Sequence, residues 1–437
     1  MFNLTTLLLQ IILILCTARF VGRLFRRFHQ PQVMGEMMAG IFLGPSLLGW
    51  LAPGIFSAVF PSQSFDFINA LSQVGLVIFM FQVGLELDPG VLRRLGYRVV
   101  AISNASIVVP FMLGALLAVF LEPVLAKPGV TPLAFTLFFG AAMSITAFPV
   151  LARILSDRRL LHTQLGTIAI TCAAIDDISG WCILAALLII VKAAGSVTPL
   201  WLTLALTLLY LAVMICIVRP LVRRFQNDLV REHTISQDRL AMILIIALAS
   251  SLTTQWLGIH PLFGAFMAGA IMPKHEGFNR ALLGRFYDSV VVLLLPMFFV
   301  YTGLRTKLGL LDQGWMWAVC GVIILVAIAG KFGGATISAR LAGIPWREAG
   351  ALGILMNTRG LMELVLLNIG LEIGVISQTV FTMLVIMAIV TTLMTAPILE
   401  RLCVSGPQEK DRGDSSVDDS VHASQGGRNY VSPGTNK

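Results

Sequence analysis

Charged residues are scarce in this chain of 437 residues, where Asp, Glu, Lys and Arg together make up 12%. A soluble protein carries about 25% charged residues, so this chain cannot cover the surface of a water-soluble globule. Apolar residues make up 57% of the sequence, which excludes disordered, collagen-like and coiled-coil chains. The composition therefore predicts a polytopic membrane protein, and the net charge of +8 has to be interpreted from where the charges lie.

Signals for metal, redox or nucleotide chemistry are also missing. The six cysteines include no Cys-x-x-Cys pair and five of them lie in apolar runs, which is typical of packing. The chain has no His-Glu-x-x-His motif and no glycine-rich loop that would hold phosphates. We therefore expect no cofactor, no enzymatic activity and no resident metal.

Long apolar runs dominate the chain, and a bilayer core takes about 20 apolar residues per helix. Clusters of charge, proline and glycine divide the chain into thirteen predicted spans, of which the ninth and tenth are short. Such continuous runs argue against a transmembrane barrel of alternating strands. The approximate limits are 2–20, 32–51, 66–86, 97–121, 131–156, 163–192, 198–222, 237–257, 259–274, 288–304, 314–340, 347–370 and 377–400.

The basic residues predict the orientation. The first apolar run has no basic residue before it and four arginines after it, so we expect an uncleaved helix that starts outside. Thirteen spans then place 25 of the 31 Lys and Arg in the cytoplasm, four outside and two, Lys331 and Arg359, within spans. This predicts a cell (inner) membrane protein whose basic charge reflects topology and the lipid bilayer, with no nucleic acid partner.

The end of the chain differs from the rest. Residues 404–437 contain almost no large apolar side chains, which predicts a disordered cytoplasmic tail after a transmembrane domain of residues 1–403. We expect this tail to be too short for a regulatory nucleotide-binding domain.

Two short strings recur in the same order seven spans apart. Gly35–Gly40 in the second span resembles Gly264–Gly269 in the ninth, and Gly84-Leu85 in the third span matches Gly303-Leu304 in the tenth. An odd separation inverts the second copy in the membrane. The sequence therefore predicts inverted six-helix repeats at about 1–192 and 237–402, joined by a linking helix at about 198–225, as in secondary transporters.

The fifth and twelfth spans are interrupted at the same depth. In the fifth span Pro149 removes a backbone donor and clashes with the preceding turn. Both spans also carry a helix-weakening polar run near the middle, so each helix is expected to be interrupted there. Broken helices at equivalent positions indicate the transport site, although a proline kink and a polar packing patch remain the alternative. The interrupting residues are Ser144, Thr146 and Pro149 in the fifth span and Asn357, Thr358 and Gly360 in the twelfth.

Three charged residues lie at the centre of predicted spans: Asp176 and Asp177 in the sixth and Lys331 in the eleventh. Each costs at least roughly 2.5–3.5 kcal/mol at mid-bilayer, so each is a candidate functional residue. Carboxylates supply the oxygen ligands that a hard cation prefers and also take up protons, so a cation and protons would compete for them.

Adjacent residues on a helix point about 100° apart, so one of these acids is expected to face Lys331 and the other the open site. The same geometry argues against an aspartyl protease. A purely structural Asp176–Lys331 pair remains an alternative.

Four other acidic residues give weaker signals. Glu86 and Asp88, near two arginines at the end of the third span, predict a solvated charge cluster or the rim of a funnel. Glu363 follows Arg359 by four residues, which predicts a pair within one helix. Glu36 is interpreted as a side chain that meets the cytoplasmic interface.

Several motifs resemble the second branch of the monovalent cation/proton antiporter superfamily, which holds bacterial sodium/proton antiporters, glutathione-gated potassium efflux systems and plant cation/proton exchangers. The resemblance covers about residues 5–400 and implies the sodium/proton antiporter fold, with two crossed, partly unwound helices, a dimerisation domain, a homodimer and elevator-like alternating access. By motif, Asp176 and Asp177 match the family's acidic pair, Lys331 its membrane lysine, and Thr146 lies at the helix crossing. The motifs are Pro31–Pro45, Ser144–Arg153, Asn357–Glu363 and Leu367–Gly370.

We therefore expect a secondary active antiporter that exchanges Na⁺ or K⁺ for protons. The Asp-Asp pair resembles electrogenic sodium/proton antiporters, whereas the residues around Thr146 and Asn357 resemble plant-like and potassium-transporting members, so both cations stay open. The alternatives are a K⁺ efflux pathway or ligand-gated cation channel on the same scaffold and a sodium-coupled symporter.

Overall fold

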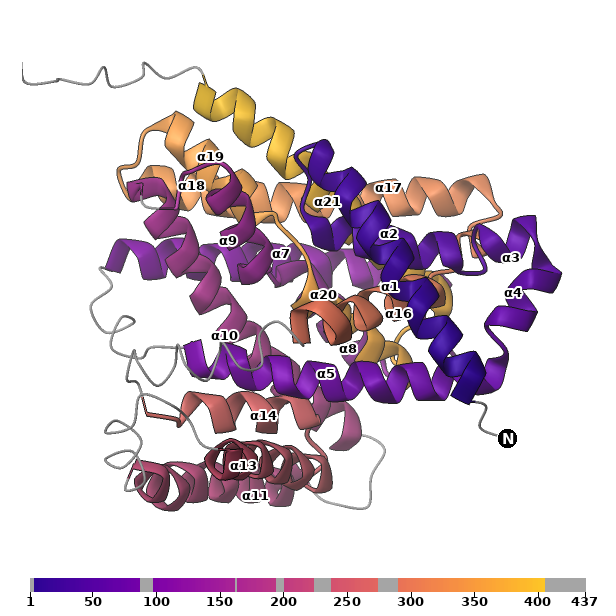
Figure 1. Cartoon of the computed structure of the whole chain (residues 1–437). Coiled ribbons are helices and arrows are strands. Elements are labelled where there is room, and N and C mark those ends of the chain that lie inside the picture. The colour runs from indigo at the N-terminus through magenta and orange to yellow at the C-terminus, as the bar shows by residue number, and fades with distance from the viewer. Residues whose placement is uncertain are drawn as a thin grey trace, which may run out of the picture.

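The computed structural model in Figure 1 describes residues 4–86, 97–161, 163–193, 200–223, 237–273 and 290–404. Within these ranges all regular structure is helical and no strand occurs. Eleven helical segments are long and apolar enough to cross a membrane, which confirms the predicted class of all-helical membrane protein. The predicted tail lies outside the described residues except for Val404, the last residue of its helix.

Two of the thirteen predicted spans are not among these eleven segments of the described residues, so the count of thirteen is not confirmed: the ninth is the ten-residue α14, and the tenth is described only from residue 290, as η3 and α16. The elements are α1 (Leu4–Arg27), α2 (Gln32–Leu43), α3 (Leu48–Leu51), α4 (Pro53–Val59), η1 (Ser62–Ser64), α5 (Phe65–Glu86), α7 (Tyr97–Leu125), α8 (Pro132–Ser144), α9 (Phe148–Asp157), α10 (Gln164–Ala193), α11 (Leu200–Val213), η2 (Met214–Val218), α13 (Gln237–Trp256), α14 (Pro261–Ala270), η3 (Val290–Leu294), α16 (Leu295–Arg305), η4 (Leu308–Leu310), α17 (Gly314–Ile328), η5 (Ala329–Gly333), α18 (Gly334–Leu341), α19 (Trp346–Met356), α20 (Leu361–Glu372) and α21 (Gln378–Val404).

The fifth and twelfth predicted spans are broken where the sequence indicated. Residues 145–147 separate α8 from α9, and residues 357–360 separate α19 from α20. The span that carries Lys331 is distorted as well, because the π-helical turn η5 separates α17 from α18. Such π-helical turns occur frequently at functional sites.

The helices pack as two sets. The first set, α1, α2, α5, α13, α14 and α16, and the second set, α7–α10 and α17–α21, each have far more extensive contacts within themselves than with one another. In Figure 1, α5 and α14 lie below the broken helices of the second set. The contacts between the sets include those of α16 with α20 and of α2 with α21.

Two glycine contacts hold the first set together. A Cβ atom on Gly40 of α2 would lie 2.8 Å from the Cα of Gly303 on α16, and a Cβ atom on Gly269 of α14 would lie 3.0 Å from the carbonyl carbon of Gly84 on α5. Only glycine permits backbones to approach this closely. Gly40 and Gly269 occupy equivalent positions in the recurring strings, as do Gly84 and Gly303, so each contact joins a glycine of a first string to a glycine of a second string.

Candidate functional site

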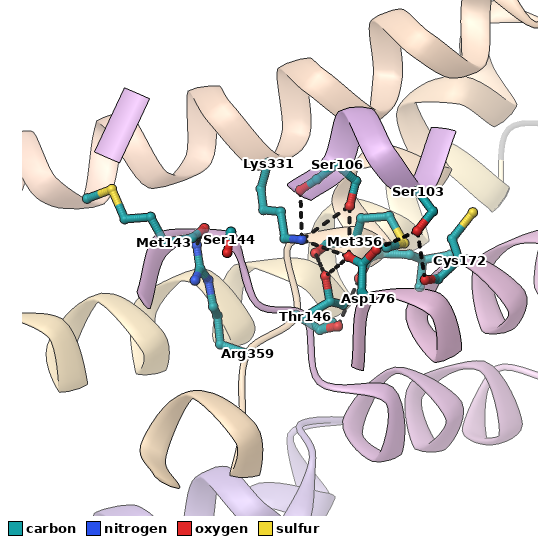
Figure 2. Close-up of polar contacts among 12 residues, drawn as sticks. Ser103, Ser106, Met143, Ser144, Thr146, Cys172, Asp176, Lys331, Met356 and Arg359 are labelled. Carbon is teal, nitrogen blue, oxygen red and sulfur yellow. Dashed lines mark hydrogen bonds and ion pairs between the residues drawn. The ribbon is translucent and has the colours of Figure 1, made fainter. Parts of the chain in front are cut away.

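The centre of the second set contains a buried ion pair. The Nζ of Lys331 lies 2.9 Å from Oδ2 of Asp176, and both side chains are fully buried. Lys331 also donates to the carbonyl oxygen of Ser106 at 2.9 Å, as Figure 2 shows. The expected pairing of one acid with this lysine is therefore confirmed.

Three hydroxyl groups complete the surroundings of Asp176. Ser103 of α7 donates to Oδ1 at 2.8 Å, Ser106 of α7 donates to Oδ2 at 2.9 Å, and Thr146 from the break between α8 and α9 approaches Oδ2 at 2.7 Å. The sequence analysis found Thr146 but missed both serines. Their spacing of three places them on one face of α7, the one signal that pointed to them.

Asp177 lies in a different environment, one residue along α10. Its side chain is 6% exposed, and the backbone amide of Phe148, the first residue of α9, donates a hydrogen bond to it. Its Oδ1 has no hydrogen-bond partner among the described residues. The carboxylate thus lies at the positive end of a half-helix and keeps one oxygen for a ligand.

The two broken helices meet backbone to backbone. The amide of Ala147 donates to the carbonyl oxygen of Thr358 at 3.0 Å, and Thr392 of α21 accepts from the amide of Arg359 at 2.8 Å. The hydroxyl of Thr146 also lies 3.1 Å from the carbonyl oxygen of Met356, the last residue of α19. The predicted interruptions therefore lie together beside Asp176.

Arg359 stabilises one of the half-helix ends. Its two terminal nitrogens donate to the carbonyl oxygens of Ala142 and Met143 at 2.7 and 2.8 Å, near the C-terminus of α8 (Figure 2). A cation at this end offsets the partial negative charge of the helix. The expected pair with Glu363 is present at 3.5 Å, with both side chains fully buried.

Within the described residues, the other predicted site residues make no hydrogen bond to Asp176 or Lys331; they are Ser144, Pro149, Asn357, Thr358 and Gly360, while the side chain of Glu86 lies outside what the structure describes. Ser144 and Thr358 donate to carbonyl oxygens of their own segments, of Ala141 and Leu355. The Oδ1 of Asn357 has no partner among the described residues. A Cβ on Gly360 would approach Val150 to 2.8 Å, so Gly360 permits close packing of the breaks. Pro149 lies in the first turn of α9 and Glu86 ends α5.

A cavity of about 400 Å³ lies between the two helix sets. Phe148 and Pro149 at the start of α9 line it, which brings it next to the residue that binds Asp177. Glu36 also lines it and is 5% exposed. The interpretation of Glu36 as an interfacial side chain is therefore wrong, because α1 and α16 pack against α2 and leave this side chain buried.

The sequence matches the family described as sodium/hydrogen exchanger, transmembrane, over residues 11–402. The chain belongs to this family. It is 46% identical to the Na⁺/H⁺ antiporter NhaS4 of Synechocystis over 92% of this chain and 98% of that protein. It is 39% identical to cation/H⁺ antiporter 17 of Arabidopsis thaliana and 32% identical to K⁺/H⁺ antiporter 1 of Saccharomyces cerevisiae.

The alignments cover 90% and 95% of this chain but only 48% and 50% of the Arabidopsis and yeast proteins. The fold resembles that of the sodium proton antiporter MjNhaP1 of Methanocaldococcus jannaschii, with a TM-score of 0.64, 15% identity and coverage of 89% of this chain and 97% of that one. Family and fold agree with the predicted sodium/proton antiporter fold, and the family consists of transporters rather than enzymes.

Proposed function

We propose that this chain is a secondary active antiporter that exchanges Na⁺ or K⁺ for protons. The observation that carries the proposal is Asp177, whose Oδ1 has no partner among the described residues although the side chain is buried beside the cavity. A buried carboxylate is stabilised by a cation or by a proton, but one oxygen cannot hold both. Competition for that oxygen would couple the two fluxes.

The neighbouring residues have distinct roles in this proposal. Thr146 and the free backbone groups of the broken helices supply additional polar ligands, since Thr146 lies between Asp176 and Met356. Lys331 keeps Asp176 paired while the site holds protons, at a distance of 2.9 Å. The arriving cation would compete for Asp176 and release the lysine.

The proposal extends to the assembly and its location. We infer a homodimer in the cell (inner) membrane, with the N-terminus outside and the C-terminus in the cytoplasm. The excess of Lys and Arg on one side of the predicted spans supports the orientation. The homodimer and the elevator-like movement rest on the family.

Reconstitution into proteoliposomes tests this function. A gradient of Na⁺, K⁺ or Li⁺ should drive protons across the membrane in the direction opposite to the cation, which is measured as a pH change. A channel or a symporter would not exchange protons for the cation. Asp177→Asn should abolish this exchange while the protein still inserts, and Asp312→Asn, which changes an exposed aspartate, is the matched control. Normal exchange by the Asp177→Asn variant would remove Asp177 from the site.

A further inference from the structure

The cavity between the helix sets contains polar groups that the proposed exchange site does not use. It is lined by Arg19 of α1, by Gln32 and Glu36 of α2, by Gln82 of α5 and by Arg153 of α9. Phe148 also lines the cavity and binds Asp177 through its amide. An ion that enters this cavity is therefore next to the residue that holds the proposed carrier.

Glu36 is a buried carboxylate without an ion-pair partner. Its side chain accepts one hydrogen bond, from Nε2 of Gln32 one turn earlier at 2.8 Å, and no basic nitrogen of the described residues lies within 4 Å. Arg19 acts on it electrostatically from a greater distance, but its guanidinium donates to the carbonyl oxygen of Val292 at 3.0 Å. A buried charge in this situation is costly until a cation or a proton joins it.

Gln82 provides a second, independent sign of a ligand. Its side chain is 3% exposed, and neither its Oε1 nor its Nε2 has a hydrogen-bond partner among the described residues. A buried polar group whose hydrogen bonds stay unmade is costly, because it has lost its contacts with water. The cavity thus presents an amide oxygen and a carboxylate, which are the ligand types that a hard cation prefers.

We propose that Glu36 and Gln82 form a second site for a monovalent cation, which a proton displaces, on the route between the cavity mouth and Asp177. This inference rests on the proposed antiport. The two arginines keep the site weak: Arg19 acts electrostatically on Glu36, and Arg153, which pairs with Asp157 at 3.1 Å, lines the same cavity. A site on a transport route has to release its ion, and weak binding permits that.

Tracer binding tests the site directly. Purified Asp177→Asn protein should bind ²²Na⁺ or ⁸⁶Rb⁺ weakly, and acid or the additional change Glu36→Gln should abolish this binding. Glu36→Asp should restore part of it. Unchanged tracer binding after Glu36→Gln would overturn the proposal, and so would the absence of binding by the Asp177→Asn protein.

Exchange in oriented vesicles separates a binding role from a structural one. In everted vesicles, where the cytoplasmic face meets the medium, Glu36→Gln should raise the apparent KM for the cation about tenfold, which corresponds to about 1.4 kcal/mol, and leave the maximal rate near normal. In right-side-out vesicles the KM should not change. The matched control is Glu400→Gln, an exposed carboxylate that pairs with Arg158.

The outcomes distinguish the two proposals. If the unmodified protein shows no exchange, the antiport function fails. Suppose that the unmodified protein exchanges normally. If Glu36→Gln then leaves the KM unchanged in both vesicle orientations, or changes it equally in both, the second site is refuted and the antiport function is not. Gln82→Leu, which keeps the size of the side chain, should raise KM on the cavity side by a smaller factor than Glu36→Gln, and no increase would exclude Gln82.

Discussion

Arg305 and Glu372 join the two helix sets at the end away from the cavity. The Nη1 of Arg305, the last residue of α16, lies 3.2 Å from Oε1 of Glu372, the last residue of α20, and donates to Oδ1 of Asn368 at 3.0 Å. The first residues of these two helices, Leu295 and Leu361, line the cavity. The cavity therefore lies at one end of the α16–α20 pair, and the Arg305–Glu372 ion pair lies at the other end.

This bridge should stabilise the state that is closed on the predicted outer side. A partly exposed ion pair contributes up to about 1 kcal/mol, so Arg305→Gln should shift the population towards the outward-open state by up to about fivefold. The apparent affinity for the cation measured in right-side-out vesicles should rise accordingly. Arg340→Gln is the control, because Arg340 stacks over Trp346 within the second set. Equal effects of both changes would assign the shift to general charge loss.

Thr146 should act on cation binding. Thr146→Val removes the hydroxyl that lies 2.7 Å from Asp176 and keeps the shape of the side chain. We expect the apparent KM for the cation to rise more than the maximal rate falls. Thr358→Val is the matched change, since that hydroxyl donates to Leu355 in its own segment, and it should leave KM almost unchanged. An unchanged KM in the Thr146 variant would move the cation site away from the crossing.

Lys331 should determine the response to membrane potential. If one cation exchanges for two protons, one net charge crosses per cycle, which is worth about 2.3 kcal/mol per 100 mV and sustains a cation gradient of roughly fiftyfold. Lys331→Gln removes one titrating group and leaves Asp176 without its ion pair. We expect slower exchange that no longer responds to potential.

The measurement is exchange in proteoliposomes clamped with valinomycin, with Na⁺ as the transported cation. Unmodified protein that ignores the clamp would refute the two-proton scheme, and the Asp176–Lys331 pair would then be structural.

The pair of Arg359 and Glu363 should be more important for stability than for exchange. Removing one member of a buried pair costs about 3–5 kcal/mol, because the other charge stays buried alone. Arg359→Gln should therefore lower the melting temperature of the purified protein strongly, also because Ala142 and Met143 lose their donor. The double change Arg359→Gln and Glu363→Gln should recover part of the loss. A double variant as unstable as the single one would contradict the pairing.

The sequence predicted the centre of the site because charge is rare in apolar spans. Asp176 and Lys331 each needed a partner of opposite charge at the same depth in the membrane. Thr146 lies in the polar run before Pro149, which predicts an interrupted helix. Ser103 and Ser106 escaped notice, because serines are ordinary in membrane helices and only the fold shows that they face Asp176. Burial of Glu36 was missed for a similar reason: its position near a helix start suggests an interface, but α1 and α16 pack against α2 there.

The length of the ninth predicted helix could not be predicted from the sequence either. The ninth predicted span covered residues 259–274, yet α14 begins at Pro261, with His260 as its N-cap, and ends at Ala270. Ile259 precedes this helix, and Ile271 and Met272 follow it, so apolar composition alone does not indicate where the backbone leaves the helical conformation.

The exchanged glycine contacts have a consequence for how the protein is made. Gly40 and Gly84 leave the ribosome more than 180 residues before their partners Gly303 and Gly269. During synthesis the glycine surfaces of α2 and α5 therefore lack these packing partners until α16 and α14 are inserted. The N-terminal half expressed alone should insert yet stay prone to degradation, and co-expression of a separate C-terminal half should protect it.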